Sequence, residues 1–345
     1  MVIMVNKKNK IKTIVVLFVA ILFACLSVSA AEKDIELVNG LKYHKSMLAG
    51  LRPVELMRIP LGKKLSSVGG SEEDPENFTE GVPFAFRATA DGAVWILDSA
   101  NKKLKLFAKN GRLKNVVSLS NMGTIVRDFA FAANNCFWLL NSIEGFIYHI
   151  DSDGKILSQI EGFADAIRIE SASNDELLVD MPMLGSVMRF GTDQTLKERY
   201  GYDEGLSLIE GIGNKVLGLS MEERNVKLMM RTVASPAQNI TLAEFPLDID
   251  NPKVSYAGAE IIGKDSNGNI YLNLIACHEE GPIFRDRLYR CSQIGKPNSF
   301  VDIITIPCLT PDLPRSKIVT PEGKIVFFYL EKNYYVLAMY TIPGA

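Results

Sequence analysis

Carboxylates and cationic side chains, rather than histidines, are the groups in this chain that could do chemistry. The 345 residues include three histidines, His44, His149 and His278, whose spacing fits no tri-histidine metal site. Charged residues instead recur on short apolar segments that each precede a polar turn. If those segments converge, their charges could hold a metal ion or an anionic ligand, or could pair with one another as structural ion pairs. The set comprises Arg87, Arg127, Asp128, Arg168, Glu170, Glu210, Glu260, Lys264, Arg315 and Lys317.

Enzyme motifs are absent from the sequence: there is no GxSxG elbow, phosphate-binding GxxxxGK[ST] loop, HExxH or GxGxxG. Asp151–Gly154 and Asp265–Gly268 resemble calcium loops, but both lack the remaining oxygen ligands, and we assign them as turns. We therefore predict no catalytic residue, no metal site and no cofactor. The residues predicted to line a binding site, from the charged set, are Arg127, Asp128, Arg168, Glu210 and Glu260.

Short β-rich runs broken by polar turns must position these charges, because helical periodicity is almost absent after Arg52. In the segment 83–111, the Asp91-Gly92 pair predicts a type I′ hairpin turn, which needs positive φ at both central residues. Strand-like runs follow, and the segment ends on a further turn at Asn110-Gly111. Equivalent first turns recur at positions 92, 135, 175, 214, 268 and 323, with separations of 43, 40, 39, 54 and 55 residues.

Six units of this length fit the four-stranded blades of a β-propeller, whose repeats run about 40–50 residues. An all-β sandwich would not account for six units at this spacing. The first unit resembles an NHL-type propeller repeat, through Pro83, the Asp91-Gly92 turn, Asp98, Asn101, Lys103, Phe107 and Gly111. The resemblance implies an all-β fold, a six-bladed β-propeller of four-stranded antiparallel blades over residues 52–345, after a lead-in segment at 31–51.

The two ends of the chain are predicted to meet in one blade. The final unit contains three strand-like runs, the last at 334–342, and lacks an outermost strand. The run at 54–59 has no turn partner of its own, so we predict that it pairs beside 334–342 and closes the ring. Continuous apolar runs such as 94–97 and 137–140 are expected where both faces of a blade are buried, with Trp95 and Trp138 packing between blades.

The last units are longer than the others, which predicts insertions around 231–256 and 278–287. Cys277 and Cys291 flank this second region, and a hairpin there could place them on neighbouring strands. A disulfide between them is one alternative, which an exported compartment would permit. Two separately buried thiols are the other.

Residues 1–30 predict export. Four lysines precede an apolar run from Thr13 to about Leu26, and Val28 and Ala30 fit the −3 and −1 positions of a signal-peptide cleavage site. Two alternatives remain open: Leu22–Cys25 resembles a lipobox in which Cys25 would be lipidated, and the stretch could stay uncleaved as an anchor. The expected location is outside the cell, in the periplasm or in the bacterial cell envelope.

The composition favours a binding protein. Hydrophobic residues make up 47% and charged residues 23%, which is typical of globular chains. Without the four lysines of residues 1–30, 34 basic residues face 40 acidic ones, a net charge of −6 that disfavours nucleic-acid binding. We expect a monomeric, non-enzymatic module that binds a protein, peptide or glycan through its loops. The alternative is a propeller enzyme, such as a metal-dependent lactonase-like hydrolase or a quinone-dependent dehydrogenase.

We predict that the mature protein begins at Ala31 or Glu32, because the small residues before Ala31 fit a signal peptidase site. Mass spectrometry of the exported protein measures its N-terminus, and Cys25→Ala should leave its release unchanged. A diacylated N-terminus at Cys25 would contradict this prediction.

Overall fold

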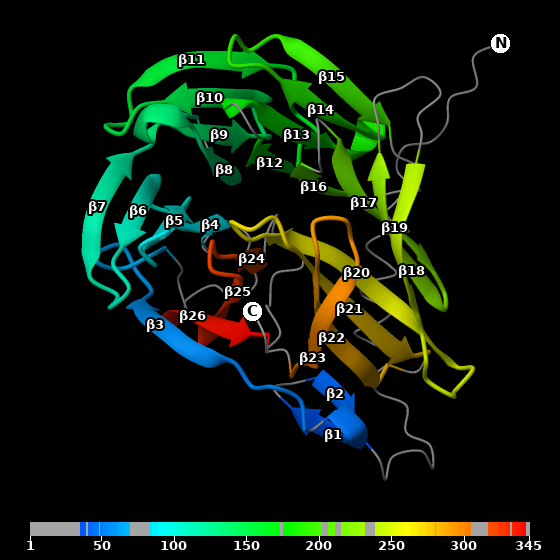
Figure 1. Ribbon diagram of the computed structural model, residues 1–345. Coiled ribbons are helices and arrows are strands. Elements are labelled where there is room, and N and C mark those ends of the chain that lie inside the picture. Colours follow the sequence, from blue (N-terminus) through cyan, green and yellow to red (C-terminus); the bar gives the residue numbers. More distant parts are fainter. Residues whose placement is uncertain are drawn as a thin grey trace, which may run out of the picture.

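Six antiparallel sheets stand around a common axis as a six-bladed β-propeller (Figure 1). A computed structural model of the chain describes residues 35–38, 41–47, 49–69, 83, 85–123, 125–172, 175–201, 206–210, 215–231, 239–279, 281–304, 317–331 and 333–342. The first strand of each blade is innermost and contacts the inner strands of the blades beside it. The predicted all-β fold and its six blades of four strands are confirmed.

Each blade follows the chain from the axis outward, apart from the last. Blade 1 comprises β4 (Ala85–Ala88), β5 (Val94–Asp98), β6 (Lys103–Phe107) and β7 (Leu113–Ser118). Blade 2 comprises β8 (Asp128–Phe131), β9 (Phe137–Asn141), β10 (Phe146–Ile150) and β11 (Ile156–Glu161). Blade 3 comprises β12 (Arg168–Ser171), β13 (Leu177–Met181), β14 (Ser186–Phe190) and β15 (Leu196–Gly201). Blade 4 comprises β16 (Leu206–Glu210), β17 (Val216–Glu222), β18 (Asn225–Arg231) and β19 (Asn239–Pro246). Blade 5 comprises β20 (Val254–Lys264), β21 (Ile270–His278), β22 (Ile283–Cys291) and β23 (Pro297–Asp302). Blade 6 comprises β24 (Lys317–Val319), β25 (Lys324–Glu331), β26 (Tyr334–Thr341) and β3 (Val54–Pro60).

Apolar side chains fill the contacts between blades. Every residue of β5, β9 and β13 is buried, because each of these strands is covered on both faces by neighbouring blades. A separate apolar cluster occupies each of the six blade-to-blade contacts. Trp95 and Trp138 belong to the clusters on either side of blade 2, as predicted, and Trp138 also stacks on His149 at 4.3 Å. The outer strand β11 instead alternates between half-buried and exposed residues.

The turns after the inner strands have a left-handed residue at each predicted position that the structure describes, and the turn of blade 2 has two, Asn134 and Asn135. Gly92, Asn135, Asp175, Gly268 and Gly323 all have positive φ. At the first turn, however, Asp91 does not, so the type I′ prediction is wrong there. Thr89 N donates to Ala93 O at 2.9 Å and Gly92 N donates to Thr89 O at 3.0 Å. These bonds leave a three-residue loop, in which a single glycine takes the left-handed conformation.

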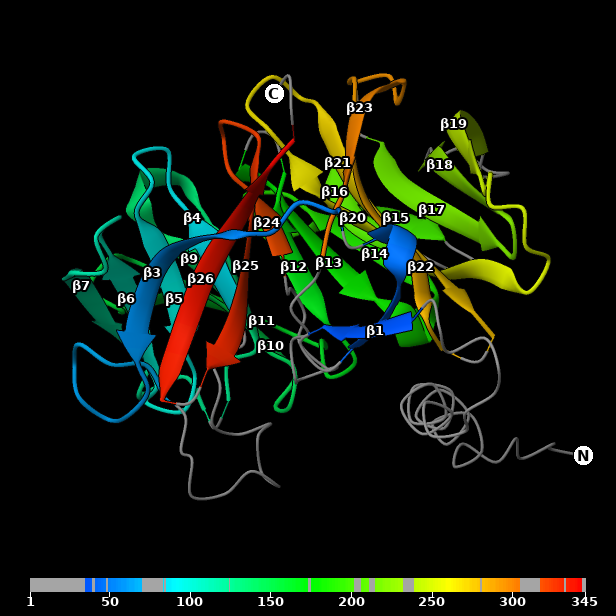
Figure 2. The ribbon, with the colours of Figure 1, turned by 90° about the horizontal axis from the view of Figure 1, so that it is seen from below.

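Pairing between β3 and β26 closes the ring, as the sequence predicts. The register runs antiparallel from Tyr334 opposite Pro60 to Met339 opposite Val54. Met57 and Ile59, 5% and 1% exposed, pack into the cluster between blades 6 and 1. Figure 2 shows β3 alongside β26, so a strand from the N-terminal part of the chain completes the last blade.

The segment after β3 continues the closure onto blade 1. Gly69 N donates to the Asp98 carboxylate at 2.8 Å. Asp98 also pairs with Lys105 at 2.6 Å, and both side chains are fully buried. Asp98, one of the residues that carries the NHL-type resemblance, therefore anchors the chain that links blade 6 to blade 1.

The lead-in segment joins blade 5 rather than standing apart from the sheets. β1 (Ile35–Val38) pairs with β2 (Leu41–His44), and Tyr43 of β2 pairs in parallel with Ile283 of β22. A short 3-10 helix follows β2 (η3, Lys45–Met47), and Tyr43 and Met47 are buried there. The predicted insertion at 278–287 is wrong, because β21 and β22 are simply longer strands, of 9 residues each, joined by a short turn.

The strand register excludes a disulfide between Cys277 and Cys291, one of the two alternatives left open by the sequence, and both cysteines are free thiols. Cys277 pairs with Ile283 near the hairpin turn, whereas Cys291 pairs with Ile270 at the far end. Eight residues along β22 separate these levels, about 26 Å at the usual rise of a strand. A disulfide needs Cα atoms within about 7 Å. Burial raises the pKa of the Cys291 thiol to about 12, so it is a protonated core group.

The predicted signal peptide and Cys25 lie outside the described residues. Within the part of the chain that the structure describes, no helix is long and apolar enough to cross a membrane.

Removing β3 should destabilise the whole ring, because it exposes the edge of β26 and the buried side chains of Met57 and Ile59. Each such side chain contributes about 1.5–3 kcal/mol when buried. We expect deletion of residues 31–60 to lower the melting temperature and promote aggregation. Deletion of 31–51 is the matched control, because it removes the hairpin on blade 5 but keeps β3. Equal melting temperatures and monomeric behaviour for the two truncations would contradict closure by β3.

Candidate functional site

Asp128 joins three inner strands near the axis. Its Oδ1 atom accepts hydrogen bonds from Arg87 Nη2 of β4 and from its own neighbour Phe129 N, each at 2.9 Å. Its Oδ2 atom accepts from Ile169 N of β12, also at 2.9 Å. The Asp128 side chain is fully buried and that of Arg87 is 8% exposed. Asp128 therefore ties blades 1, 2 and 3 together as a buried, hydrogen-bonded carboxylate.

Further polar contacts tie other inner strands around the axis. Lys317 of β24 pairs with Glu260 of β20 at 3.3 Å, which joins blades 6 and 5. The Ser171 hydroxyl of β12 donates to the Phe131 carbonyl of β8, which adds a second tie between blades 3 and 2. Arg87 also lies over the Phe129 ring at 5.0 Å. Four of the ten charged residues, Arg87, Asp128, Glu260 and Lys317, thus form ion pairs between blades. Structural ion pairing was one of the two roles that the sequence left open for this set.

An axial hollow of about 390 Å³ opens where the inner strands end. Its walls come from the last residues of β4, β8, β12, β20 and β24 and from the turns that follow two of them, so five of the six blades contribute. We call the side of the disc that carries these turns the inner-turn face. The described residues that line the hollow are Arg87, Ala88, Phe131, Glu170, Ser171, Ile262, Gly263, Lys264, Asp265, Ser266, Ile318, Val319 and Pro321.

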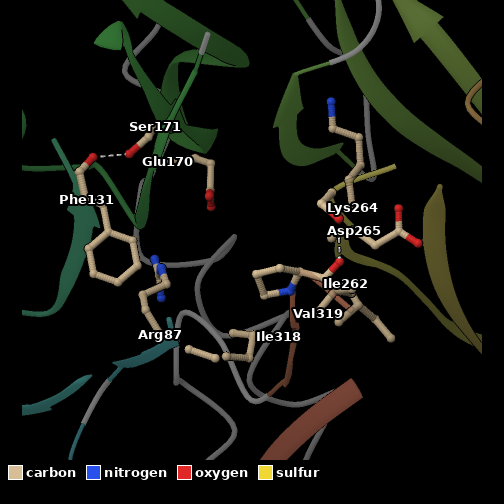
Figure 3. Close-up of a pocket in the computed structure, with 13 residues that line it drawn as sticks. Arg87, Phe131, Glu170, Ser171, Ile262, Lys264, Asp265, Ile318 and Val319 are labelled. Carbon is tan, nitrogen blue, oxygen red and sulfur yellow. Dashed lines mark hydrogen bonds between the residues drawn. The ribbon is translucent and has the colours of Figure 1, made fainter. Parts of the chain in front are cut away.

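Charges of both signs occupy opposite walls of this hollow. Figure 3 shows Arg87 and Glu170 on one side and Lys264 and Asp265 on the other, above the apolar residues Ile318 and Val319. Glu170 and Lys264 are both half-buried. An apolar wall with a few converging charged groups is the usual composition of a ligand pocket. The arrangement can bind a ligand that carries apolar surface together with charged groups.

Asp265 shapes the wall of the hollow rather than offering a ligand group. Its carboxylate accepts hydrogen bonds from Asn267 N and Asn269 N, both at 2.9 Å, and from the Tyr271 hydroxyl at 3.1 Å. Burial and the neighbouring Asp265 carboxylate raise the pKa of Tyr271 to about 12. Tyr271 therefore stays protonated and donates to Asp265 throughout the physiological pH range.

Four of the five predicted binding residues, Arg127, Asp128, Arg168 and Glu260, are not among the described residues that line this hollow. Asp128 and Glu260 are engaged in the ties between blades. Arg127 is exposed just before β8, at the opposite end of the inner strand, and Arg168 is half-buried at the start of β12. Glu210 ends β16, but its side chain lies outside the described residues. These positions do not converge on one site among the residues that can be placed.

Residues just before the first turn of five blades line the hollow instead. Arg87 is next to last in its inner strand, and the last residues of the other four inner strands are Phe131, Ser171, Lys264 and Val319. This position could have been used as a criterion at the level of the sequence. All inner strands of a propeller run in the same direction, so their last residues meet on one face. Choosing charges by their place in the strand, rather than by type alone, would have selected Glu170 and Lys264.

Metal-ligating side chains do not cluster in the described part of the chain, where no three His, Cys, Asp or Glu residues are placed to hold an ion. His149 lies on β10, away from the axis, where it stacks on Trp138. Burial lowers the pKa of His149, which favours its neutral form.

Comparisons with known proteins find similar structures but no family. No protein-family model and no curated protein matches the sequence. Virginiamycin B lyase from Staphylococcus aureus is 11% identical, with a TM-score of 0.46 over 83% of this chain and 99% of its own. Hydrazine synthase from Kuenenia stuttgartiensis is 11% identical, with a TM-score of 0.47 over 75% and 86% of the two chains. The C-terminal WD40 domain of Sif2 is 12% identical, with a TM-score of 0.45 over 75% and 81%. The assignment of this chain as a propeller rests on its own sheet topology.

Asp128→Asn should destabilise the ring, because it removes the carboxylate charge that pairs with the buried Arg87 guanidinium. Removing one partner of a buried ion pair costs about 3–5 kcal/mol, so we expect a loss at the lower end of this range. Urea unfolding measures it. Asp91→Asn is the control, because Asp91 pairs with Lys114 on the surface, where such pairs contribute about 0–1 kcal/mol. If the two variants unfold at the same urea concentration, the contacts of Asp128 do not stabilise the packing of blades 1, 2 and 3.

Proposed function

We propose that this protein is a non-enzymatic binding module that takes a protein, peptide or glycan ligand on its inner-turn face. The observation that carries the proposal is the axial hollow, whose walls come from five blades and carry charged residues on opposite sides. A site built on strand ends of several blades keeps its geometry when the loops around it vary. The ligand would place charged groups against Glu170 and Lys264.

Rigidity of the walls supports this role. The hydrogen bonds of Asp265 fix the turn of blade 5, and Ser266 donates from both its N and its Oγ to Pro321 O of blade 6, at 3.0 and 2.8 Å. Asp128 holds the inner strands of blades 1 to 3 at a fixed spacing. A preorganised site loses little conformational freedom on binding, and that reduces the free-energy cost of association.

Export of the protein is part of the proposal. It rests on the lysine-rich start, the apolar run and the small residues that precede Ala31. A module of this kind would meet its ligand outside the cytoplasm, in the cell envelope or beyond it. Cleavage before Ala31 is the processing route that we favour over lipidation at Cys25.

The binding site can be tested by comparing two double variants of the full chain on peptide and glycan arrays. Glu170→Gln with Lys264→Ala changes the hollow, and Glu223→Gln with Lys102→Ala makes matched changes in exposed residues on the opposite face. We expect the affinity for the ligands that bind the unaltered chain to fall about tenfold or more in the first variant, since charged hydrogen bonds contribute about 1.5–3 kcal/mol. The second variant should bind within about twofold of the unaltered chain.

Two results would overturn the proposal. One is that every ligand binds both double variants equally well, which would place recognition away from the hollow. The other is that neither array yields any ligand for the unaltered chain.

A further inference from the structure

A second hollow of about 390 Å³ adjoins the axial one on the inner-turn face. It lies between Leu217 of blade 4 and the inner turn of blade 5, and Gln293 from the outer part of blade 5 also lines it. Lys264 and Ser266 line both hollows. The two hollows are therefore adjacent at these residues, and together we call them the groove, which extends outward from the axis beside blades 4 and 5.

The outer part of the groove has a fixed and polar wall. Gln293 Nε2 donates to the carbonyl of Asn267 at 2.5 Å, which ties the inner turn of blade 5 to the outer turn of the same blade. Gly268, with a φ of 75°, lets the two turns approach, since a Cβ there would come within 2.9 Å of the Gln293 side chain. The wall offers a hydroxyl at Ser266, amide groups at Asn267 and Gln293, and the Lys264 ammonium.

This chemistry fits a peptide better than a glycan. Amide and hydroxyl side chains can donate to and accept from the amides of a peptide chain. Phe131 is the one aromatic ring among the described residues that line either hollow, so there is little aromatic surface on which sugar rings could stack. Glu170 and Lys264 carry opposite charges on facing walls of the axial hollow. Such a pair is complementary to a chain that carries both a basic and an acidic group.

We infer that the ligand is a peptide segment that lies along this groove, from the axial hollow past Lys264 into the outer hollow. Its basic group faces Glu170, and its acidic group faces Lys264. The outer part of the segment bonds to Asn267 and Ser266. This inference rests on the proposed binding function and assigns a ligand class to the same site.

The test uses a randomised peptide library selected on the full chain and counter-selected on a charge-reversed variant, Glu170→Lys with Lys264→Glu. We expect the recovered peptides to share one basic and one acidic residue at a constant spacing. Lys264→Glu should weaken a recovered peptide about tenfold or more. Replacing the acidic residue of that peptide by lysine should restore its affinity for Lys264→Glu.

The outer part of the groove has its own test. Asn267→Ala should weaken the full-length peptide but leave a version truncated to its charged pair unaffected. Asn110→Ala, an exposed amide on the same face in blade 1, is the matched control and should change neither affinity.

The outcomes separate this inference from the proposed function. If glycans rather than peptides bind, and lose affinity in the Glu170→Gln and Lys264→Ala variant, the binding function holds and the peptide assignment is wrong. The peptide assignment is also wrong if recovered peptides share no charged pair or if the charge swap fails to restore affinity. If recovered peptides bind equally well to all these variants, the axial hollow is not the site and both proposals fail.

Discussion

Burial of apolar surface between blades is the constraint on which this structure depends. The middle strands of the blades are apolar on both faces, so a single blade cannot cover its own side chains. Each face is covered by the next blade, and six separate clusters result. Only a closed ring covers all of them. β3 completes the ring by pairing with β26, which makes a strand from the start of the chain necessary for the last blade.

Closure of the ring also determines where a ligand site can form. The ring brings the inner strands together at the axis, and buried polar contacts then hold their spacing, above all those of Asp128. Charged residues such as Asp128 and Glu260 form contacts of this kind between blades. Glu170 and Lys264, at the ends of their inner strands, line the hollow. A rigid framework with a variable face is a common way to support binding.

The repeat and its turns could be predicted from the sequence because they depend on local features. A residue that tolerates positive φ recurs at each described first turn, and apolar runs follow it. Closure of the ring was predictable because the strand-like run at 54–59 had no neighbouring run in the sequence with which it could form a hairpin. The sequence left a disulfide between Cys277 and Cys291 open, because their spacing does not reveal the tight turn before Ile283 that sets the register of β21 and β22. The residues that line the hollow could not be singled out from their residue types in the sequence. Whether a charged side chain, such as that of Asp128, contacts a neighbouring blade or lines the hollow depends on the packing of the blades.

Hydrogen–deuterium exchange of the backbone amides in β3 tests the central claim most directly. If β3 closes the ring, its amides that bond to β26 open only when the propeller unfolds. They should then exchange at the same rate as the slowest amides of β25 and β26, and this rate should follow global stability in dilute denaturant. Exchange in β3 that is far faster than in β25, and insensitive to denaturant, would show that the ring is held together without it.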